Sequence, residues 1–205
     1  MKNTIITLGR QFGSGGRMIG KKVAKELGFA FYDKELIAAA AEASGMDKEL
    51  LEKNDESIKG NLFHNFTLGL YNAANTFSEM SDISLNDRAF LIQSDIIKDI
   101  AKRENAVIVG RCADYVLREF DNCFNVFIFA DIDNRMERAA TEYGMSRNNL
   151  KETIIKMDKR RSSYYNYYTG KKWGKALSYH MSLDSGKIGM DKCVAIIQEM
   201  VKTEN

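Results

Sequence analysis

The sequence contains no proline, so glycine has to mark the turns and helix ends that proline would ordinarily punctuate. Its three cysteines form no Cys-x-x-Cys pair and its two histidines complete no ligand cluster with them, which excludes a structural zinc site of ordinary spacing. A formal net charge of only +2 is too small for neutralising a nucleic-acid backbone over a broad surface. Any site for an anionic ligand must therefore be local.

The remaining composition is that of one soluble globular domain. Its 205 residues are enough to bury a core, and 44% hydrophobic with 28% charged residues is a normal balance for such a protein. Met1 leads directly into a strand-like pattern with no long apolar segment behind it, so we expect a cytoplasmic protein with reduced thiols. No repeat or linker divides the sequence.

Short apolar runs alternate with helical patterns, which favours an α/β fold with a parallel sheet covered on both faces. Strands are predicted at residues 4–8, 29–32, 106–109, 124–129 and, near the end, 179–183. Helices are predicted at residues 17–27, 33–44, 87–103 and 191–201, with a charged helical region over 131–169 and weaker patterns at 47–54 and 61–80.

A glycine-rich loop, Gly-Arg-Gln-Phe-Gly-Ser-Gly-Gly-Arg over residues 9–17, joins the first predicted strand to the first predicted helix. Glycines let backbone N–H groups turn towards an anion, and a helix N-terminus adds a positive dipole end. The loop departs from the strict phosphate-binding pattern because Gly16 stands where the lysine belongs. The predicted nucleotide-binding residues are Arg10, Gly13, Ser14, Gly15, Gly16 and Arg17, with a plain tight turn as the alternative.

Several spaced segments resemble the cytidylate kinase-like family, related to kinases that phosphorylate cytidine monophosphate. They are the loop with the helix after it, the segments at 31–34, 106–111, 124–130 and 183–185, the lid arginines Arg135 and Arg138, and the Asp-x-x-Arg element of Asp158 and Arg161. Compared with cytidylate kinases proper, Val109 and Cys112 replace acidic residues. The resemblance spans nearly the whole chain.

This resemblance implies a P-loop NTPase-like three-layer α/β/α fold with a central parallel sheet, a helical monophosphate-binding insert and a lid. The implied organisation is a single domain over 1–205, with a core at 1–34, 104–134 and 176–205. The acceptor-binding helical insert is expected at about 35–103 and the lid at about 135–175.

Phosphoryl transfer needs several cationic groups around one site, and the arginines are the candidates. Arg111 follows a strand at its carboxyl end, so we expect it to hold the acceptor's phosphate, a surface salt bridge being the alternative. Asp33 either orients a magnesium-bound water or contacts the acceptor, or it caps the next helix. Arg17, Arg161 and Arg135 are the catalytic candidates, although a solvated helix face explains each lid arginine equally well. Tyrosines near Trp173 are expected to pack.

The leading functional hypothesis is ATP-dependent phosphoryl transfer to a nucleoside monophosphate, CMP or dCMP before others. Mg²⁺ is expected to arrive on the nucleotide phosphates, without a dedicated protein metal site. Expected partners are small-molecule nucleotides and, as one option, a second copy in a homodimer; neither nucleic acid nor membrane is expected. A kinase with another small acceptor is one alternative, and a nucleotide-binding regulator without turnover, favoured by the missing lysine, is the other.

Overall fold

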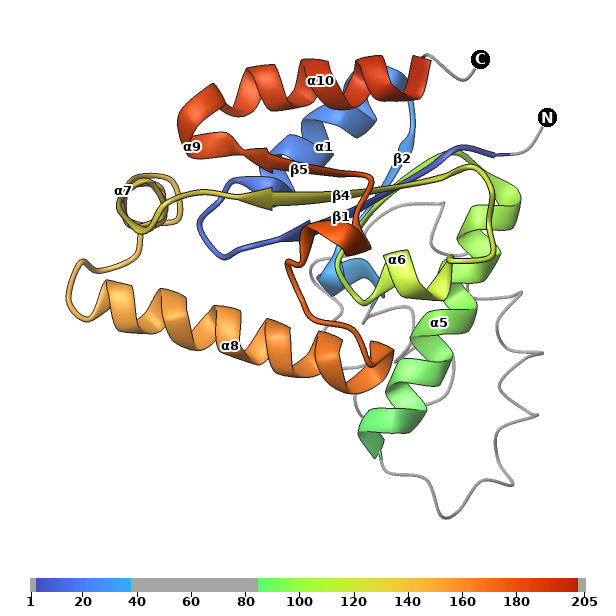
Figure 1. Cartoon of the computed structure of the whole chain (residues 1–205), viewed down its shortest axis with the longest axis horizontal. Helices are drawn as coiled ribbons and strands as arrows, with labels where there is room; N and C mark the ends of the chain where they lie inside the picture. Colours follow the sequence, from blue (N-terminus) through green and yellow to red (C-terminus); the bar gives the residue numbers. More distant parts are fainter. Residues whose placement is uncertain (1–2, 38–84, 203–205) are drawn as a thin grey trace, which may run out of the picture. The chain divides into compact units, whose positions relative to one another are not determined.

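The computed structural model describes residues 3–37 and 85–202 (Figure 1). Contacts divide the chain into two units, Met1–Asp33 with Ala101–Asn205 and Lys34–Ile100. The first unit contains the sheet. In the second unit, the described parts are a helical turn at residues 34–37 and most of helix α5 (Leu85–Arg103). The expected domain boundaries remain predictions, and the expected insert ends at the last residue of α5.

The sheet has five strands in the order β2-β3-β1-β4-β5, and every neighbouring pair is parallel. The strands are β1 (Ile5–Arg10), β2 (Ala30–Tyr32), β3 (Ala106–Val109), β4 (Cys123–Phe129) and β5 (Met181–Asp184). Ile5 of β1 pairs with Ala106 on one side and Cys123 on the other. Because all strands are parallel, their carboxyl ends lie along one edge of the sheet.

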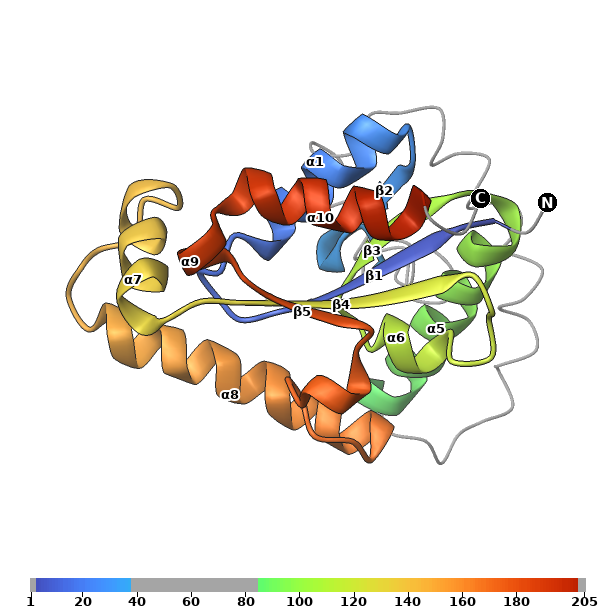
Figure 2. The ribbon, with the colours of Figure 1, turned by 45° about the horizontal axis from the view of Figure 1, so that its top comes forward.

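Helices cover both faces of the sheet (Figures 1 and 2). On one face lie α1 (Gly16–Leu27) and α10 (Met190–Lys202), and on the other lie α6 (Ala113–Val116) and α8 (Leu150–Thr169). Helix α7 (Ile132–Thr141) follows β4, and α9 (Ser185–Ile188) follows β5. The 3₁₀ turn η1 (Ala176–Ser178) precedes β5. The predicted three-layer α/β/α architecture is confirmed.

The main core lies between the sheet and the layer of α1 and α10. Ile6 and Leu8 are fully buried there against Ile19 and Val23 of α1, with Ile197 from α10 completing the contact. Alternate residues of a strand point to the same face, and residues four apart share a helix face, so both periodicities meet in one cluster. This packing fixes the start of α1 at the end of β1.

The boundaries differ from the sequence predictions in a few places. The region predicted as one charged helical stretch is two helices, α7 and α8, separated by a turn that contains Gly144 in the left-handed region at φ 65°. The last strand begins at Met181 rather than 179, because Tyr179 ends the 3₁₀ turn. Helices predicted at 47–54, 61–80 and beyond residue 37 lie outside the described residues.

Candidate functional site

Polar groups gather at the edge of the sheet where the strands end. Arg10 closes β1, Asp33 follows β2, Arg111 follows the glycine after β3, and Ser185 follows β5. Ligands of open parallel sheets bind outside the carboxyl ends of the strands. Sheet topology therefore brings together residues that are up to 175 positions apart in a chain of 205.

The carbonyl oxygens of the glycine-rich loop are held outward by side chains from α7, α8 and α9. Three arginines and one serine donate to four of them: Arg161 Nη1 to Arg10 O at 3.0 Å, Arg135 Nη1 to Phe12 O at 3.3 Å, Arg138 Nη1 to Gly13 O at 2.8 Å, and Ser185 Oγ to Ser14 O at 2.6 Å. Gln11 O accepts instead from the backbone and hydroxyl of Ser14. The loop is thus fixed peptide by peptide.

The same geometry leaves backbone N–H groups of the loop available. The C=O and N–H of a trans peptide point in opposite directions, so carbonyls held outward turn the next residue's N–H inward. Among the residues that the structure describes, no backbone carbonyl accepts a hydrogen bond from the N–H of Gly13, Gly15 or Gly16, and the Gly15 N–H lies against the hydroxyl of Tyr143. Gly15, the N-cap of α1, supplies no side-chain cap. Such N–H groups at a helix N-terminus form an anion-binding nest.

Positive φ angles at two glycines produce this nest. Gly13 has φ 77° and Gly15 has φ 74°, a region that residues with a Cβ rarely adopt. A Cβ on Gly13 would lie 2.6 Å from the carbonyl oxygen of Arg135, and one on Gly15 would lie 2.6 Å from Sδ of Met190. Gly13 therefore requires glycine for both backbone angle and space, whereas Gly15 requires it for backbone angle, because the flexible Met190 side chain can move aside.

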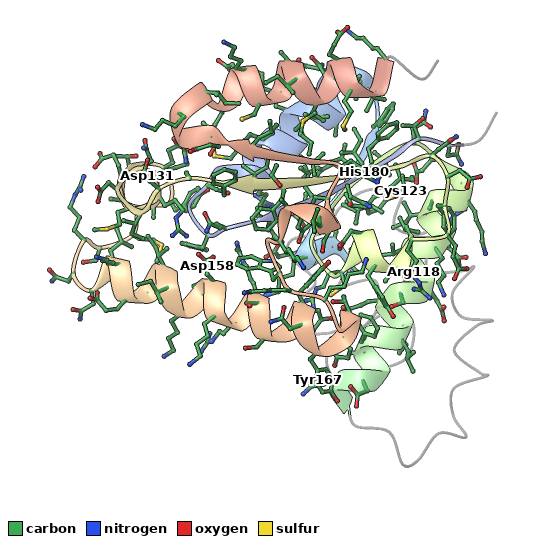
Figure 3. All side chains as sticks on the ribbon, in the orientation of Figure 1. Arg118, Cys123, Asp131, Asp158, Tyr167 and His180 are labelled. Atoms are coloured by element: carbon green, nitrogen blue, oxygen red, sulfur yellow. The ribbon has the colours of Figure 1, made fainter. Side chains whose placement is uncertain are left out.

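Asp158 of α8 links the loop to α7. Its Oδ1 accepts the Phe12 N–H at 2.7 Å, and its Oδ2 pairs with Nη1 of Arg135. Figure 3 shows Asp158 on the side of α8 that faces the loop. The side chains of Asp158 and Arg135 are only 14% and 9% exposed, so each charge depends on the other. In this structure Asp158 and the predicted catalytic residues Arg135 and Arg161 hold the loop.

Arg17 and Asp33 form an ion pair with each other. Nε and Nη2 of Arg17 both donate to Oδ2 of Asp33, at 2.9 and 2.6 Å. Asp33 is buried, whereas the side chain of Arg17 is 57% exposed. Sequence reasoning placed Arg17 with the nucleotide and Asp33 with the acceptor; the structure brings them into contact between the first turn of α1 and the end of β2.

The turn after β3 has unusual backbone geometry. Gly110, Arg111 and Cys112 have φ angles of 83°, 55° and 55°, three consecutive residues in the left-handed region. Non-glycine residues held in that region are energetically costly and concentrate at ligand sites. A Cβ on Gly110 would collide with Nη1 of Arg10, so the Arg10 side chain lies directly against this turn. Arg10, the last residue of β1, therefore contacts the turn that carries Arg111.

The guanidinium of Arg111 lies 5.7 Å from the centre of the Tyr164 ring. Its Nε is buried and has no hydrogen-bond partner among the described residues. Arg135 and Arg138 also carry a buried Nε without a hydrogen-bond partner in the described part of the chain, so the position of Arg111 just past a strand's carboxyl end is what marks it as a ligand candidate. Next to it, burial raises the pKa of the Cys112 thiol to about 12, so this thiol stays protonated and is a poor nucleophile.

The glycine-rich loop carries one hydroxyl, that of Ser14, as a candidate magnesium ligand. Ser14 is fully buried, and its Oγ donates its proton to Gln11 O at 2.8 Å. Over residues 3–37 and 85–202, no group of three or more His, Cys, Asp or Glu side chains could hold a metal ion. In the same residues no helix is both long and apolar enough to cross a membrane.

The aromatic segment at the end of α8 is mostly packing. Trp173 meets Phe127 edge-on with ring centres 5.3 Å apart, and Tyr165 is buried, as predicted for this cluster. Tyr167 is the exception, 72% exposed and on the outer side of α8 (Figure 3). Tyr165 also donates its hydroxyl to Oδ2 of Asp114 at 2.7 Å.

The buried carboxyl of Asp114 predicts a pH effect on stability. Burial raises the pKa of Asp114, and the Tyr165 hydrogen bond only partly opposes that shift. The folded state then binds this proton more tightly than the unfolded state, so Asp114 favours folding at low pH and this contribution is lost as pH rises through its folded pKa. Relative to wild type, Asp114→Asn should gain stability in urea unfolding as the pH rises above about 4, the ordinary pKa of an aspartate. A difference independent of pH would contradict this assignment.

Sequence reasoning missed two of the residues that shape the loop. Ser185 was seen only as part of a family motif, although its position directly after a strand's carboxyl end was a usable signal. Gln11 was given no role, yet its Oε1 accepts the Ala130 N–H at 3.2 Å and ties the loop to the end of β4. No sequence pattern marks a glutamine for that contact.

A parallel sheet with a glycine-rich loop between β1 and α1 is typical of the P-loop kinase class of folds. Two shikimate kinases of known structure share it: one from Bacteroides thetaiotaomicron (17% identity, 97% of this chain and 98% of that chain covered, TM-score 0.51) and one from Acinetobacter baumannii in complex with shikimate (13%, 99% and 95%, TM-score 0.50). At these identities the likeness concerns the fold alone.

The chain belongs to the cytidylate kinase-like family, whose model matches residues 5–187. It is also similar over nearly its whole length to an uncharacterized protein from Eubacterium ventriosum, at 26% identity with 98% of this chain and 99% of that chain covered and a TM-score of 0.73. A search of the curated proteins returned no match. The family membership confirms the resemblance that the motifs suggested.

Proposed function

We propose that this protein transfers the γ-phosphate of ATP to a nucleoside monophosphate, with CMP and dCMP as the first candidates. The observation that carries the proposal is the loop of β1–α1, whose carbonyls accept from side chains and whose Gly13, Gly15 and Gly16 N–H groups donate to no backbone carbonyl of the described residues. A polyphosphate supplies oxygens for these donors at the positive end of α1. Family membership supports a kinase.

The acceptor is proposed to place its phosphate at the Arg111 turn. Arg111 carries a buried Nε without a partner in the described part of the chain, on a strained backbone beside Arg10. Two arginines at one edge favour a dianionic phosphate, because guanidinium groups hold phosphate oxygens through paired N–H donors. Mg²⁺ is proposed to come with ATP, since it retains several waters and needs few protein ligands.

The first experiment is ADP formation by the purified protein with ATP and Mg²⁺ against a panel of nucleoside monophosphates. CMP- or dCMP-dependent turnover is expected, with Arg17→Ala measured alongside because Arg17 is the loop's exposed cation. Shikimate belongs in the panel, because two neighbours of the same fold are shikimate kinases. Turnover with shikimate and none with nucleoside monophosphates would show that the protein is a kinase whose acceptor is not a nucleotide.

Arg111→Ala is expected to raise the KM for the acceptor about 100-fold, the effect of removing an ionic phosphate contact of roughly 3 kcal/mol, while the Kd for ATP stays unchanged. Arg118→Ala is the matched control, because Arg118 is a nearby exposed arginine that stacks on Tyr115. Steady-state kinetics with varied acceptor give the KM values. An unchanged acceptor KM in Arg111→Ala would remove Arg111 from the acceptor site.

A nucleotide-binding regulator without turnover is the second candidate. It is favoured by Gly16, which offers no side chain where kinases of this class carry a lysine, and by Arg17, which is already paired with Asp33. ATP binding measured by calorimetry, together with no ADP formed with any acceptor of the panel, would support this candidate. An Asp33→Asn variant that frees Arg17 would then show whether the pair restrains turnover.

A further inference from the structure

We infer that Ser185 is a positioning residue of the phosphate loop: its hydroxyl aims the Gly15 N–H into the anion-binding nest. Ser185 is the first residue of α9, and β5 places it there although 171 residues separate it from Ser14. This inference rests on the proposed phosphate-binding role of the loop and adds to it a residue from the other end of the chain.

The geometry of one peptide carries the inference. Oγ of Ser185 lies 2.6 Å from the carbonyl oxygen of Ser14, which belongs to the same peptide unit as the Gly15 N–H. Because the two groups of a trans peptide are antiparallel, holding that carbonyl fixes the opposite direction for the N–H. Gly15 has φ 74°, so no regular helical hydrogen bond would otherwise fix this peptide. No backbone carbonyl of the described residues accepts from the Gly15 N–H, whose neighbour is the hydroxyl of Tyr143.

Burial makes this contact persistent. Ser185 is only 2% exposed, and its hydroxyl also lies 3.2 Å from the carbonyl oxygen of Phe129, the last residue of β4. Water cannot readily replace a donor at such a site, so removal of the hydroxyl, which has a single proton to donate, leaves the nearer carbonyl oxygen, that of Ser14, short of a partner. Asp184 holds Ser185 in place by accepting from the N–H groups of Gly186 and Lys187 at 3.0 and 3.2 Å.

Arg135 orients another peptide of the loop in the same way. Its hydrogen bond to Phe12 O fixes the peptide that carries the Gly13 N–H. Arg135, however, carries a charge and an ion pair with Asp158, so its removal disturbs several contacts together. Ser185 is neutral and small, and its substitution by alanine removes one donor and little volume. It is therefore the cleaner position for testing whether carbonyl orientation controls phosphate binding.

The test uses full-length protein labelled with ¹⁵N-glycine, whose 15 glycines give a tractable amide spectrum, titrated with pyrophosphate and separately with ATP. In wild type the Gly15 amide is expected to shift on titration. In Ser185→Ala the Gly15 amide should already move in the ligand-free protein, and the Kd for both ligands should rise about tenfold. Ser185→Thr, which keeps the hydroxyl, should restore the Kd. Ser182→Ala, an exposed serine of β5, is the matched control.

An unchanged Gly15 amide together with an unchanged Kd in Ser185→Ala would overturn the inference. If wild type itself binds neither ligand, the proposed function fails, whereas the ligand-free Gly15 shift still decides the positioning role. Should Ser185→Ala not fold, Ser185→Cys provides the comparison, because a thiol is close in size and a weaker donor. A rise in Kd that Ser185→Thr does not reverse would also contradict a role for the hydroxyl.

Discussion

Replacing Asp158 by alanine is expected to lower the free energy of unfolding by about 3 kcal/mol, because it leaves the charge of Arg135 buried without its partner. The side chain of Arg135 is 9% exposed, so water cannot compensate for the lost carboxylate. The Phe12 N–H also loses its acceptor, which loosens the start of the glycine-rich loop. Urea unfolding monitored by circular dichroism measures the change.

The chain offers a surface ion pair as a control for this prediction. Glu137 and Arg147 lie 2.8 Å apart, but their side chains are 59% and 65% exposed. Glu137→Ala should therefore change stability by less than about 0.5 kcal/mol. Replacement of both buried partners, as Arg135→Met with Asp158→Leu, should recover much of the loss, since it removes both charges. A loss of similar size in Asp158→Ala and Glu137→Ala would show that burial of the first pair contributes nothing.

Gly13→Ala is expected to weaken ATP binding at least about 100-fold, equivalent to roughly 3 kcal/mol. The left-handed backbone at φ 77° opposes any side chain, and the new Cβ would lie 2.6 Å from the carbonyl oxygen of Arg135. Relief of that overlap has to move the loop away from α7 and break the contact between Arg138 and Gly13 O. Isothermal calorimetry with ATP gives the affinities.

Gly28→Ala separates the cost of the left-handed backbone from the cost of the steric overlap in Gly13→Ala. Gly28 ends α1 at φ 69°, similar to Gly13, but a Cβ there meets nothing within 4 Å. Its substitution should cost about 1 kcal/mol of stability and leave ATP affinity unchanged. If Gly13→Ala binds ATP as wild type does, the loop does not hold the nucleotide phosphates. If Gly28→Ala loses affinity as well, the effect comes from general destabilisation.

The strands and the loop could be predicted because their signals are local. The buried run at 106–109 reads as a strand and is one, and the glycines at 13–16 lie where β1 gives way to α1. Helices α6 and α9 escaped prediction because four residues do not complete enough turns to show a period. Residues 142–149 escaped too, since no proline marks the end of α7.

The partners of the arginines could not be predicted, because they depend on tertiary contacts. The sequence predicts Arg17 at the site from its place in the loop and Arg161 from the family's Asp-x-x-Arg element. Arg17, however, points to the carboxylate of Asp33, and Arg161 donates to a backbone carbonyl at the end of β1. Basic residues in a sequence indicate a region where an anion could bind. The direction in which a long side chain points depends on the element packed beside it.

The order of the strands also sets the time at which the central strand can be completed. Residues of β1 leave the ribosome first, but their neighbours in β3 follow roughly 100 residues later and those in β4 later still. At the usual pace of synthesis, β1 spends about 5–20 s without either neighbour. Closure over such long separations slows folding, and an apolar strand exposed for that time is where chaperone binding would be most useful.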